Sequence, residues 1–172
     1  MISRHTGARA FIPAALAAAI LLSLAPSTPA AATTTTTEAQ QIIRIARAQL
    51  GDPWRYGASG PYAFDCSGLV RYAYRRAGDG AAIHSRYLRS ARSLYRWFRA
   101  HGRASRTNPR IGDLVIWGYG THVGIYVGHG RAISTLMNGV RVHNLYVLRA
   151  RFTAFLHTGM STKIATTPAP SS

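Results

Sequence analysis

The sequence is poor in cysteine, in lysine and in acidic residues. Among its 172 residues, Cys66 is the single cysteine and Lys163 the single lysine, and only five residues are Asp or Glu. A lone cysteine excludes a disulfide bond within the chain. The sequence shows no internal repeat, and its His, Cys and Asp residues lack the spacing of metal ligands. We therefore expect neither a metal nor a cofactor.

No apolar run near the N-terminus is long enough to span a membrane. The run FIPAALAAAILLSLA is shorter than the roughly 20 residues that cross a bilayer. It follows Arg4 and Arg9 and precedes small residues around Ala30. This order predicts a secretory signal peptide over residues 1–32, with an uncleaved membrane anchor as the alternative. No cysteine follows the run directly, so we expect no lipid anchor. Removal of the signal peptide would also remove the apolar run, so we expect no transmembrane anchor after processing.

Two segments lack the apolar periodicity of folded structure. The threonine-rich residues 33–40 predict a linker, and residues 160–172, rich in Thr, Ala, Pro and Ser, predict a disordered tail. A single folded domain should therefore cover residues 41–159.

The charge is strongly positive and comes almost entirely from arginine. The net charge is +16, and about +14 would remain if Arg4 and Arg9 left with a signal peptide. Outside a cell, the polyanions available to such a protein are wall polymers and phospholipid head groups. Export argues against a nucleic-acid partner. An arginine excess without any partner is the alternative.

Periodicity predicts helices first and strands afterwards. Apolar residues at helical spacing indicate helices within residues 38–51, 65–78 and 85–102. The third has an apolar stripe that includes Tyr87, Leu94 and Phe98, and its arginines form either a solvated face or a docking surface. Short β-branched and aromatic runs predict strands at 113–117, 122–128, 131–135, 140–145 and 152–157. This order predicts an α+β fold.

Cys66 lies at or just before the first turn of the second predicted helix. Asp65 or Ser67 can cap that helix, and Gly68 leaves room for another segment to approach. The unpaired backbone N–H groups and the dipole of a helix start stabilise a thiolate, so we predict a reactive thiol. The alternatives are a disulfide bridge to another chain and a buried, inert cysteine.

A nucleophilic cysteine needs a base, and His122 is the best-placed histidine. In a strand over residues 122–128, the valine and isoleucine side chains would face the core, which leaves His122 facing a helix start. If Val127 pairs with Arg131 across a hairpin, Ser134 is the diagonal neighbour of His122 and can accept a hydrogen bond from its Nδ1–H. A purely structural histidine is the alternative.

Three blocks of sequence together resemble the NlpC-type cell-wall endopeptidases, a family of papain-like cysteine peptidases. The blocks are YGASGPYAFDCSGLVRYAY, GDLVIW and THVGIYVGHGRAIS, within about residues 41–157. The resemblance implies a papain-like α+β fold, with N-terminal helices packed on an antiparallel sheet and the nucleophile at a helix N-terminus. Cys66 matches the nucleophile and His122 the base, while the residues that match substrate-binding positions are Tyr56, Asp65 and Ser67.

The resemblance also implies a function at the cell wall. Members of this family cleave peptidoglycan stem peptides through a Cys–His thiolate mechanism, usually between D-γ-glutamyl and a diamino acid. Ser134 stands where the family usually has a histidine as third catalytic residue, and we expect it to orient His122. Two alternatives stay open. One is a wall-binding module on the same fold with weak or no activity, and the other is an amidase or acyltransferase using the same dyad.

Overall fold

The computed structural model describes residues 36–162 of the chain. The predicted signal peptide, most of the predicted linker before residue 36 and the predicted tail from residue 163 onward lie outside the described residues. Between residues 36 and 162, no helix combines the length and the apolar character needed to cross a membrane.

Within residues 36–162, three α-helices precede the main strands of the sheet. They are α1 (Glu38–Arg47), α2 (Cys66–Arg76) and α3 (Ala91–Ala100). The first helix begins inside the segment 33–40, because Thr37 and Gln40 form a capping box that satisfies its first backbone N–H groups. The second helix begins directly after Asp65, which is one of its two predicted caps.

The third helix is shorter than the predicted range of 85–102. Ser90 forms a capping box with Ser93 and thereby fixes its start. The preceding residues form the 3₁₀-helix η1 (Gly80–Ile83) and turns. Tyr87 was predicted to lie in the buried stripe, but it is 78% exposed, so this part of the prediction is wrong. Phe98, on the part that is helical, is buried as predicted.

Six antiparallel strands form one sheet in the described part of the chain, in the order β1-β6-β2-β3-β4-β5. They are β1 (Ala104–Ser105), β2 (Leu114–Trp117), β3 (His122–Gly128), β4 (Arg131–Leu136), β5 (Gly139–Asn144) and β6 (Phe152–Leu156). The predicted α+β fold is confirmed. Only β1 is not predicted, because two residues are too few to show an alternating pattern.

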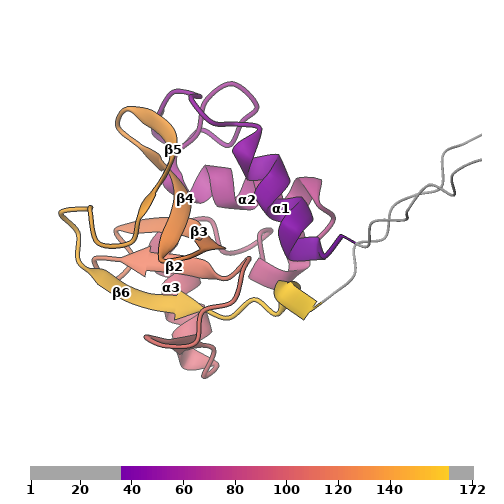
Figure 1. The fold of residues 1–172 in the computed structure, drawn as a ribbon, viewed down its shortest axis with the longest axis vertical. Helices are drawn as coiled ribbons and strands as arrows, with labels where there is room; N and C mark the ends of the chain where they lie inside the picture. Colours follow the sequence, from indigo (N-terminus) through magenta and orange to yellow (C-terminus); the bar gives the residue numbers. More distant parts are fainter. Residues whose placement is uncertain (1–35, 163–172) are drawn as a thin grey trace, which may run out of the picture. The chain divides into compact units, whose positions relative to one another are not determined.

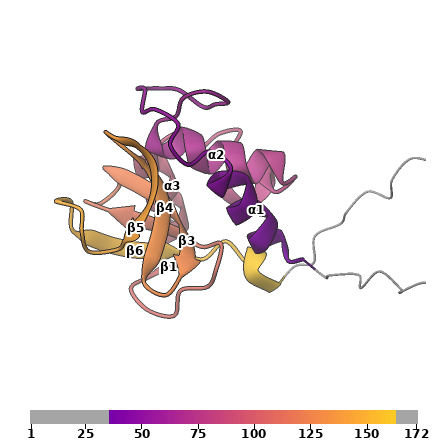
Figure 2. The ribbon, with the colours of Figure 1, turned by 45° about the horizontal axis from the view of Figure 1, so that its top comes forward.

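The helices cover one face of the sheet, and Figures 1 and 2 show α1 and α2 on the same side of it. The core on this side joins Leu69 of α2 and Phe98 of α3 to Val123 and Ile125 of β3. A second apolar cluster covers the opposite face and includes Trp117, Tyr126 and Phe155. Strands β2 and β6 are buried at every residue, which explains why they read as nearly continuous apolar runs.

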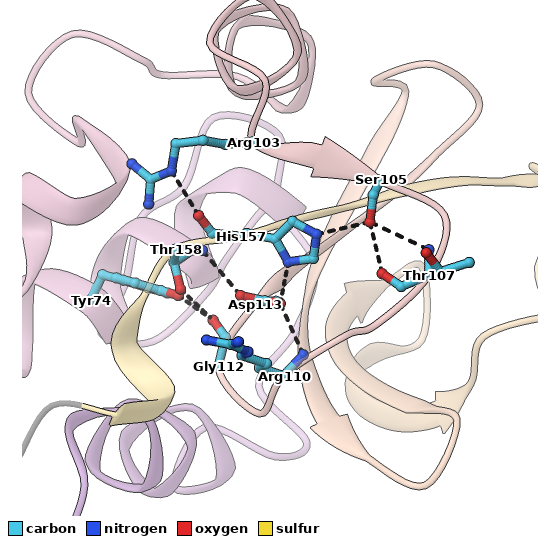
Figure 3. A network of polar contacts seen from close by, with 9 residues as sticks. All are labelled: Tyr74, Arg103, Ser105, Thr107, Arg110, Gly112, Asp113, His157 and Thr158. Carbon is cyan, nitrogen blue, oxygen red and sulfur yellow. Dashed lines mark hydrogen bonds and ion pairs between the residues drawn. The ribbon is translucent and has the colours of Figure 1, made fainter.

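A polar network fastens β6 to its neighbours (Figure 3). His157 Nδ1 lies 2.9 Å from Asp113 Oδ2, and His157 Nε2 lies 2.8 Å from Ser105 Oγ. The buried Asp113 also accepts hydrogen bonds from two backbone N–H groups. Tyr74 of α2 donates to the carbonyl of Gly112 beside it. The chain continues into the 3₁₀-helix η2 (Met160–Thr162), inside the predicted tail.

Candidate active site

The start of α2 is built around the carboxylate of Asp65. Its Oδ1 accepts hydrogen bonds from the backbone N–H of Gly68 at 2.6 Å and from the hydroxyl of Ser67 at 2.9 Å. Its Oδ2 accepts one from the backbone N–H of Gly57 at 3.0 Å. Asp65 therefore caps the helix and also holds the preceding loop, and Cys66 follows as the first helical residue.

That loop lies directly on α2 because residue 68 is glycine. A Cβ atom at Gly68 would lie 1.9 Å from the carbonyl oxygen of Ala58, a distance that no side chain tolerates. The same carbonyl accepts a hydrogen bond from the backbone N–H of Asp65 at 2.9 Å. The predicted close approach of another segment to Gly68 is confirmed, and the segment is the loop that carries Tyr56.

Cys66 and His122 face one groove of about 440 Å³. α2 packs against β3, and the thiol of Cys66 lies against the backbone of Val123, the residue that follows His122. The three predicted substrate-binding residues also line this groove: Tyr56, Asp65 and Ser67. Five of the six predicted site residues therefore share a single surface, and the sixth, Ser134, lies behind His122.

Burial raises the pKa of the Cys66 thiol. A backbone hydrogen bond from Val123 opposes this effect, the neighbouring carboxylate of Asp65 adds to it, and backbone hydrogen bonds in the first turn of α2 oppose it. Burial therefore opposes the thiolate that the sequence predicts at this helix start. The helix start does act in the predicted direction, but removing water from the sulfur has the larger effect.

His122 is also uncharged at neutral pH. Burial and, to a smaller extent, the nearby His143 lower the pKa of His122 to about 4. A neutral imidazole carries one N–H and one nitrogen with a free lone pair. Next to a thiol, such a ring can accept the proton of the nucleophile and so act as a general base.

Ser134 lies behind His122 and is fully buried. Its Oγ is 2.9 Å from His122 Nε2 and 2.8 Å from His143 Nε2. The contact to His122 uses Nε2, whereas the sequence led us to expect Nδ1, and that detail is wrong. Ser134 sits on the neighbouring strand, so it meets the ring nitrogen that is farther from the His122 backbone.

The register of the β3–β4 hairpin explains why Ser134 reaches His122. Ile125 pairs with Ile133, which is the register predicted for this part of the hairpin. At the turn, Arg131 pairs with Gly128 and not with Val127, because a β-bulge inserts one residue there. The prediction is therefore wrong at the turn only, and the register next to the site is confirmed.

His143 is a site residue that the sequence did not lead us to assign. The pairing of Ser134 with Arg141 places His143 diagonally opposite Ser134 on the adjacent strand. The signal in the sequence is the Asn-Gly pair at Asn138 and Gly139, a strong indicator of a two-residue hairpin turn. Leu136 pairs with Gly139, so the two residues of the observed turn are Met137 and Asn138. Counting from Asn138 and Gly139 as the turn would place Ser134 directly opposite His143, and would therefore indicate the contact in a register that differs from the observed one.

Arginines gather at one end of the groove. Arg71 and Arg89 line it, and together with Arg75 and Arg86 they also line an adjoining cavity of about 830 Å³. The pKa of Arg71 is lowered by burial and then by the charges of Arg89 and Arg75, so these guanidinium groups lie close enough to repel one another. An anionic group bound here would relieve that repulsion.

The Ser105–His157–Asp113 contact has the order of a serine hydrolase triad, but its surroundings indicate a structural role (Figure 3). The Ser105 hydroxyl lies 2.7 Å from the carbonyl of Thr107, which can accept its proton. None of the three residues lines the groove that holds Cys66. Within residues 36–162, no three or more His, Cys, Asp and Glu side chains are grouped so that they could hold a metal ion.

Residues 51–157 match the family described as the NlpC/P60 family. A protein of Listeria monocytogenes named "Probable endopeptidase p60" is 35% identical over 108 residues, which make up 61% of this chain and 20% of that protein. The chain therefore spans only about a fifth of the length of that relative.

Two solved structures from Mycobacterium tuberculosis share the fold. The peptidoglycan hydrolase RipB superposes with a TM-score of 0.54 at 30% identity, over 70% of this chain and 63% of that one. RipD, described as a non-catalytic NlpC/p60 domain protein adapted to peptidoglycan binding, superposes with a TM-score of 0.55 at 24% identity, over 71% of this chain and 97% of that one. At that identity the second likeness shows the fold alone.

Proposed function

Because this chain belongs to the NlpC/P60 family, we propose that it is a peptidoglycan endopeptidase with Cys66 as its nucleophile and His122 as its base. One observation carries the proposal: the first residue of α2 and the first residue of β3, a cysteine and a histidine, line the same groove. A thiol nucleophile needs a base within reach, whereas a module that only binds the wall needs neither group.

The proposed reaction starts from a neutral thiol and a neutral imidazole. Since His122 Nε2 faces Ser134, Nδ1 is the nitrogen left for the groove. Nδ1 takes the proton of Cys66 as the sulfur attacks the peptide carbonyl, and the imidazolium then protonates the leaving amine as the C–N bond breaks. Water, deprotonated by His122, then hydrolyses the thioester, and the imidazolium returns the proton to the departing sulfur of Cys66. The backbone N–H of Cys66, with Tyr56, is our candidate for stabilising the oxyanion.

The proposed substrate is a stem peptide with a free amine, cut between D-γ-glutamyl and a diamino acid. The support is the position of Tyr56, Asp65 and Ser67 along the groove. A carboxylate offers about four lone-pair sites, and Asp65 uses three of them within the protein. One site therefore remains for a donor on the substrate, and the negative charge of Asp65 favours an ammonium group.

The alternatives differ in their products, so one experiment separates them. The protein is incubated with purified peptidoglycan fragments, and the products are read by mass spectrometry. An endopeptidase releases truncated stem peptides, whereas an amidase releases whole stem peptides from the glycan. An acyltransferase moves the acyl group to another acceptor, and a wall-binding module releases nothing.

We also propose that the protein is secreted and held at the wall by anionic polymers. The order of charged, apolar and small residues in 1–32 supports export. The arginines beside the groove support an anionic partner, because they add positive charge at a surface next to the site. Export also removes the protein from nucleic acids, so we expect no nucleic-acid partner.

A further inference from the structure

His122, Ser134 and His143 form a continuous chain of hydrogen bonds that ends on the backbone. His122 Nε2 lies 2.9 Å from Ser134 Oγ, which lies 2.8 Å from His143 Nε2. His143 Nδ1 lies 2.9 Å from the carbonyl oxygen of Asn144. A carbonyl oxygen can only accept, so this last contact fixes the direction of the whole chain.

The proton positions follow from that fixed end. His143 must carry its proton on Nδ1 to donate to Asn144, so a neutral His143 presents a lone pair on Nε2. The hydroxyl of Ser134 then donates to His143 and accepts from His122 Nε2–H. The proton of the neutral His122 ring is therefore on Nε2, and Nδ1 keeps the lone pair that a general base needs.

The surrounding side chains hold both rings. The indole of Trp117 lies against His122, with ring centres 5.4 Å apart, and against His143, with ring centres 5.6 Å apart. Trp117 is itself fixed, because its Nε1–H donates to the carbonyl of Leu145 at 2.7 Å. Ser134 has no exposed surface, so water does not compete for its hydroxyl.

We propose that His143 is a positioning residue of the active site and acts on His122 through the hydroxyl of Ser134. The inference rests on the proposed function of Cys66 and His122. A serine alone is a mobile acceptor, because its hydroxyl rotates. With His143 taking the hydroxyl proton, Ser134 points a lone pair at His122. Ser134 and His143 together then orient the ring of His122, which a single polar residue does in a standard triad.

This arrangement assists the reaction without moving a proton beyond His122. When His122 takes the proton of Cys66, its Nε2–H becomes more acidic and its hydrogen bond to Ser134 strengthens. The bond from Ser134 to His143 polarises in the same direction. A charged His143 would lower the pKa of His122, but burial also lowers the pKa of His143 and keeps that ring neutral. With His143 neutral, the two hydrogen bonds favour the imidazolium as it forms and oppose the effect of burial, while His143 keeps its own proton on Nδ1 throughout.

The test combines kinetics with NMR of the histidine rings in the full chain. ¹H–¹⁵N correlation spectra distinguish a ring N–H from a bare ring nitrogen and so report the tautomer of His122. The informative variants are His143→Phe, which removes the acceptor, and His143→Gln, whose side-chain oxygen can still accept from Ser134. His157→Gln is the matched control, because it removes a histidine–serine contact of the same kind, to Ser105, and neither residue lines the groove.

We expect wild-type His122 to carry its proton on Nε2, and His143→Phe to mix the two tautomers. The same variant should lower kcat about fivefold, the equivalent of one hydrogen bond, with KM unchanged. His143→Gln should recover most of kcat, and His157→Gln should change neither readout. In a Ser134→Ala background, His143→Phe should cost nothing more, since the two residues act as one unit.

Three results would overturn the inference. They are a wild-type His122 protonated on Nδ1, a His143→Phe protein that keeps both tautomer and kcat, or losses from Ser134→Ala and His143→Phe that multiply. The wild-type spectrum decides even if His143→Phe does not fold. A wild-type protein that releases no peptide would refute the proposed function, while the spectra would still test the hydrogen-bond chain.

Discussion

Cys66 and His122 are both buried enough that each charged form is disfavoured on its own. Transfer of the proton between them creates two opposite charges at once, and these attract each other at short range. The reactivity of Cys66 therefore depends on the proton being accepted as the attack proceeds, rather than on a standing thiolate. The base must then be neutral and correctly oriented before the substrate arrives.

This requirement predicts an unusually acidic limit of activity. The pKa of His122 is lowered to about 4, so the ring is protonated, and unable to act as a base, only below that pH. We expect kcat/KM, which reports on the free enzyme, to stay level from neutral pH to about pH 5 and to fall with a midpoint near 4. A midpoint near 6.5, the ordinary histidine value, would contradict the account, provided circular dichroism shows a folded protein throughout.

Ser134 illustrates what a sequence can and cannot give. Its position behind His122 is predictable, because a hairpin register is set by counting from a glycine-containing turn. Its other partner, His143, lies across a second hairpin, β4–β5, and an error in the first register adds to any error in the second. From the sequence alone, Ser134→His would be expected to preserve or raise activity. The contact with His143 changes that expectation.

We predict that Ser134→His lowers kcat about tenfold, the equivalent of losing one hydrogen bond worth about 1.4 kcal/mol. The larger ring has no space, because Ser134 Oγ is already 2.8 Å from His143 Nε2. Removing that neighbour should make room, so Ser134→His with His143→Ala should recover activity relative to Ser134→His alone. Steady-state kinetics of the two variants are the measurement. A double variant no better than the single one would count against this packing.

At the scale of elements, a helix start could be predicted from the sequence where a capping residue marks it. The sequence offers Asp65 or Ser67 as the cap of α2, and the structure uses Asp65. The start of α3 was predicted too early, because the apolar spacing around Tyr87 continues through residues that the Ser90 capping box excludes from the helix. Periodicity shows which residues could share a face, whereas caps and tertiary contacts decide where a helix begins.

The packing of the Tyr56 loop on α2 gives a prediction at this scale. Gly68→Ala places a methyl group 1.9 Å from the Ala58 carbonyl, so the loop must move away. We expect a loss of about 1–3 kcal/mol in the free energy of unfolding, measured by denaturant titration. Activity should fall as well, since that loop forms one wall of the groove.

Arg75→Ala is the control for this change. Arg75 is exposed on the same helix, so its replacement should alter stability by about 0.5 kcal/mol or less. Equal stability of the Gly68→Ala and Arg75→Ala proteins would mean that the loop does not pack on α2 as described.

At the scale of the whole molecule, the positive charge predicts salt-sensitive binding to cell walls. The Debye length falls from about 10 Å at 0.1 M salt to about 3 Å at 1 M, so binding measured by co-sedimentation should weaken over this range. Replacing Arg75 and Arg86 by Gln should weaken binding more than replacing Arg44 and Arg47, although both pairs remove the same charge. All four side chains are exposed, but only the first pair lies beside the groove. Equal losses of wall binding in the two double variants would indicate that binding depends on net charge alone and not on the arginines beside the groove.

The most direct test of the central proposal compares the wild-type chain with Cys66→Ala on purified peptidoglycan, with released peptides identified by mass spectrometry. The wild-type protein should release truncated stem peptides. Cys66→Ala should release none while keeping its circular dichroism spectrum, because the thiol contributes reactivity more than packing. Release of the same peptides by the folded Cys66→Ala protein, or of none by the wild type, would contradict the account.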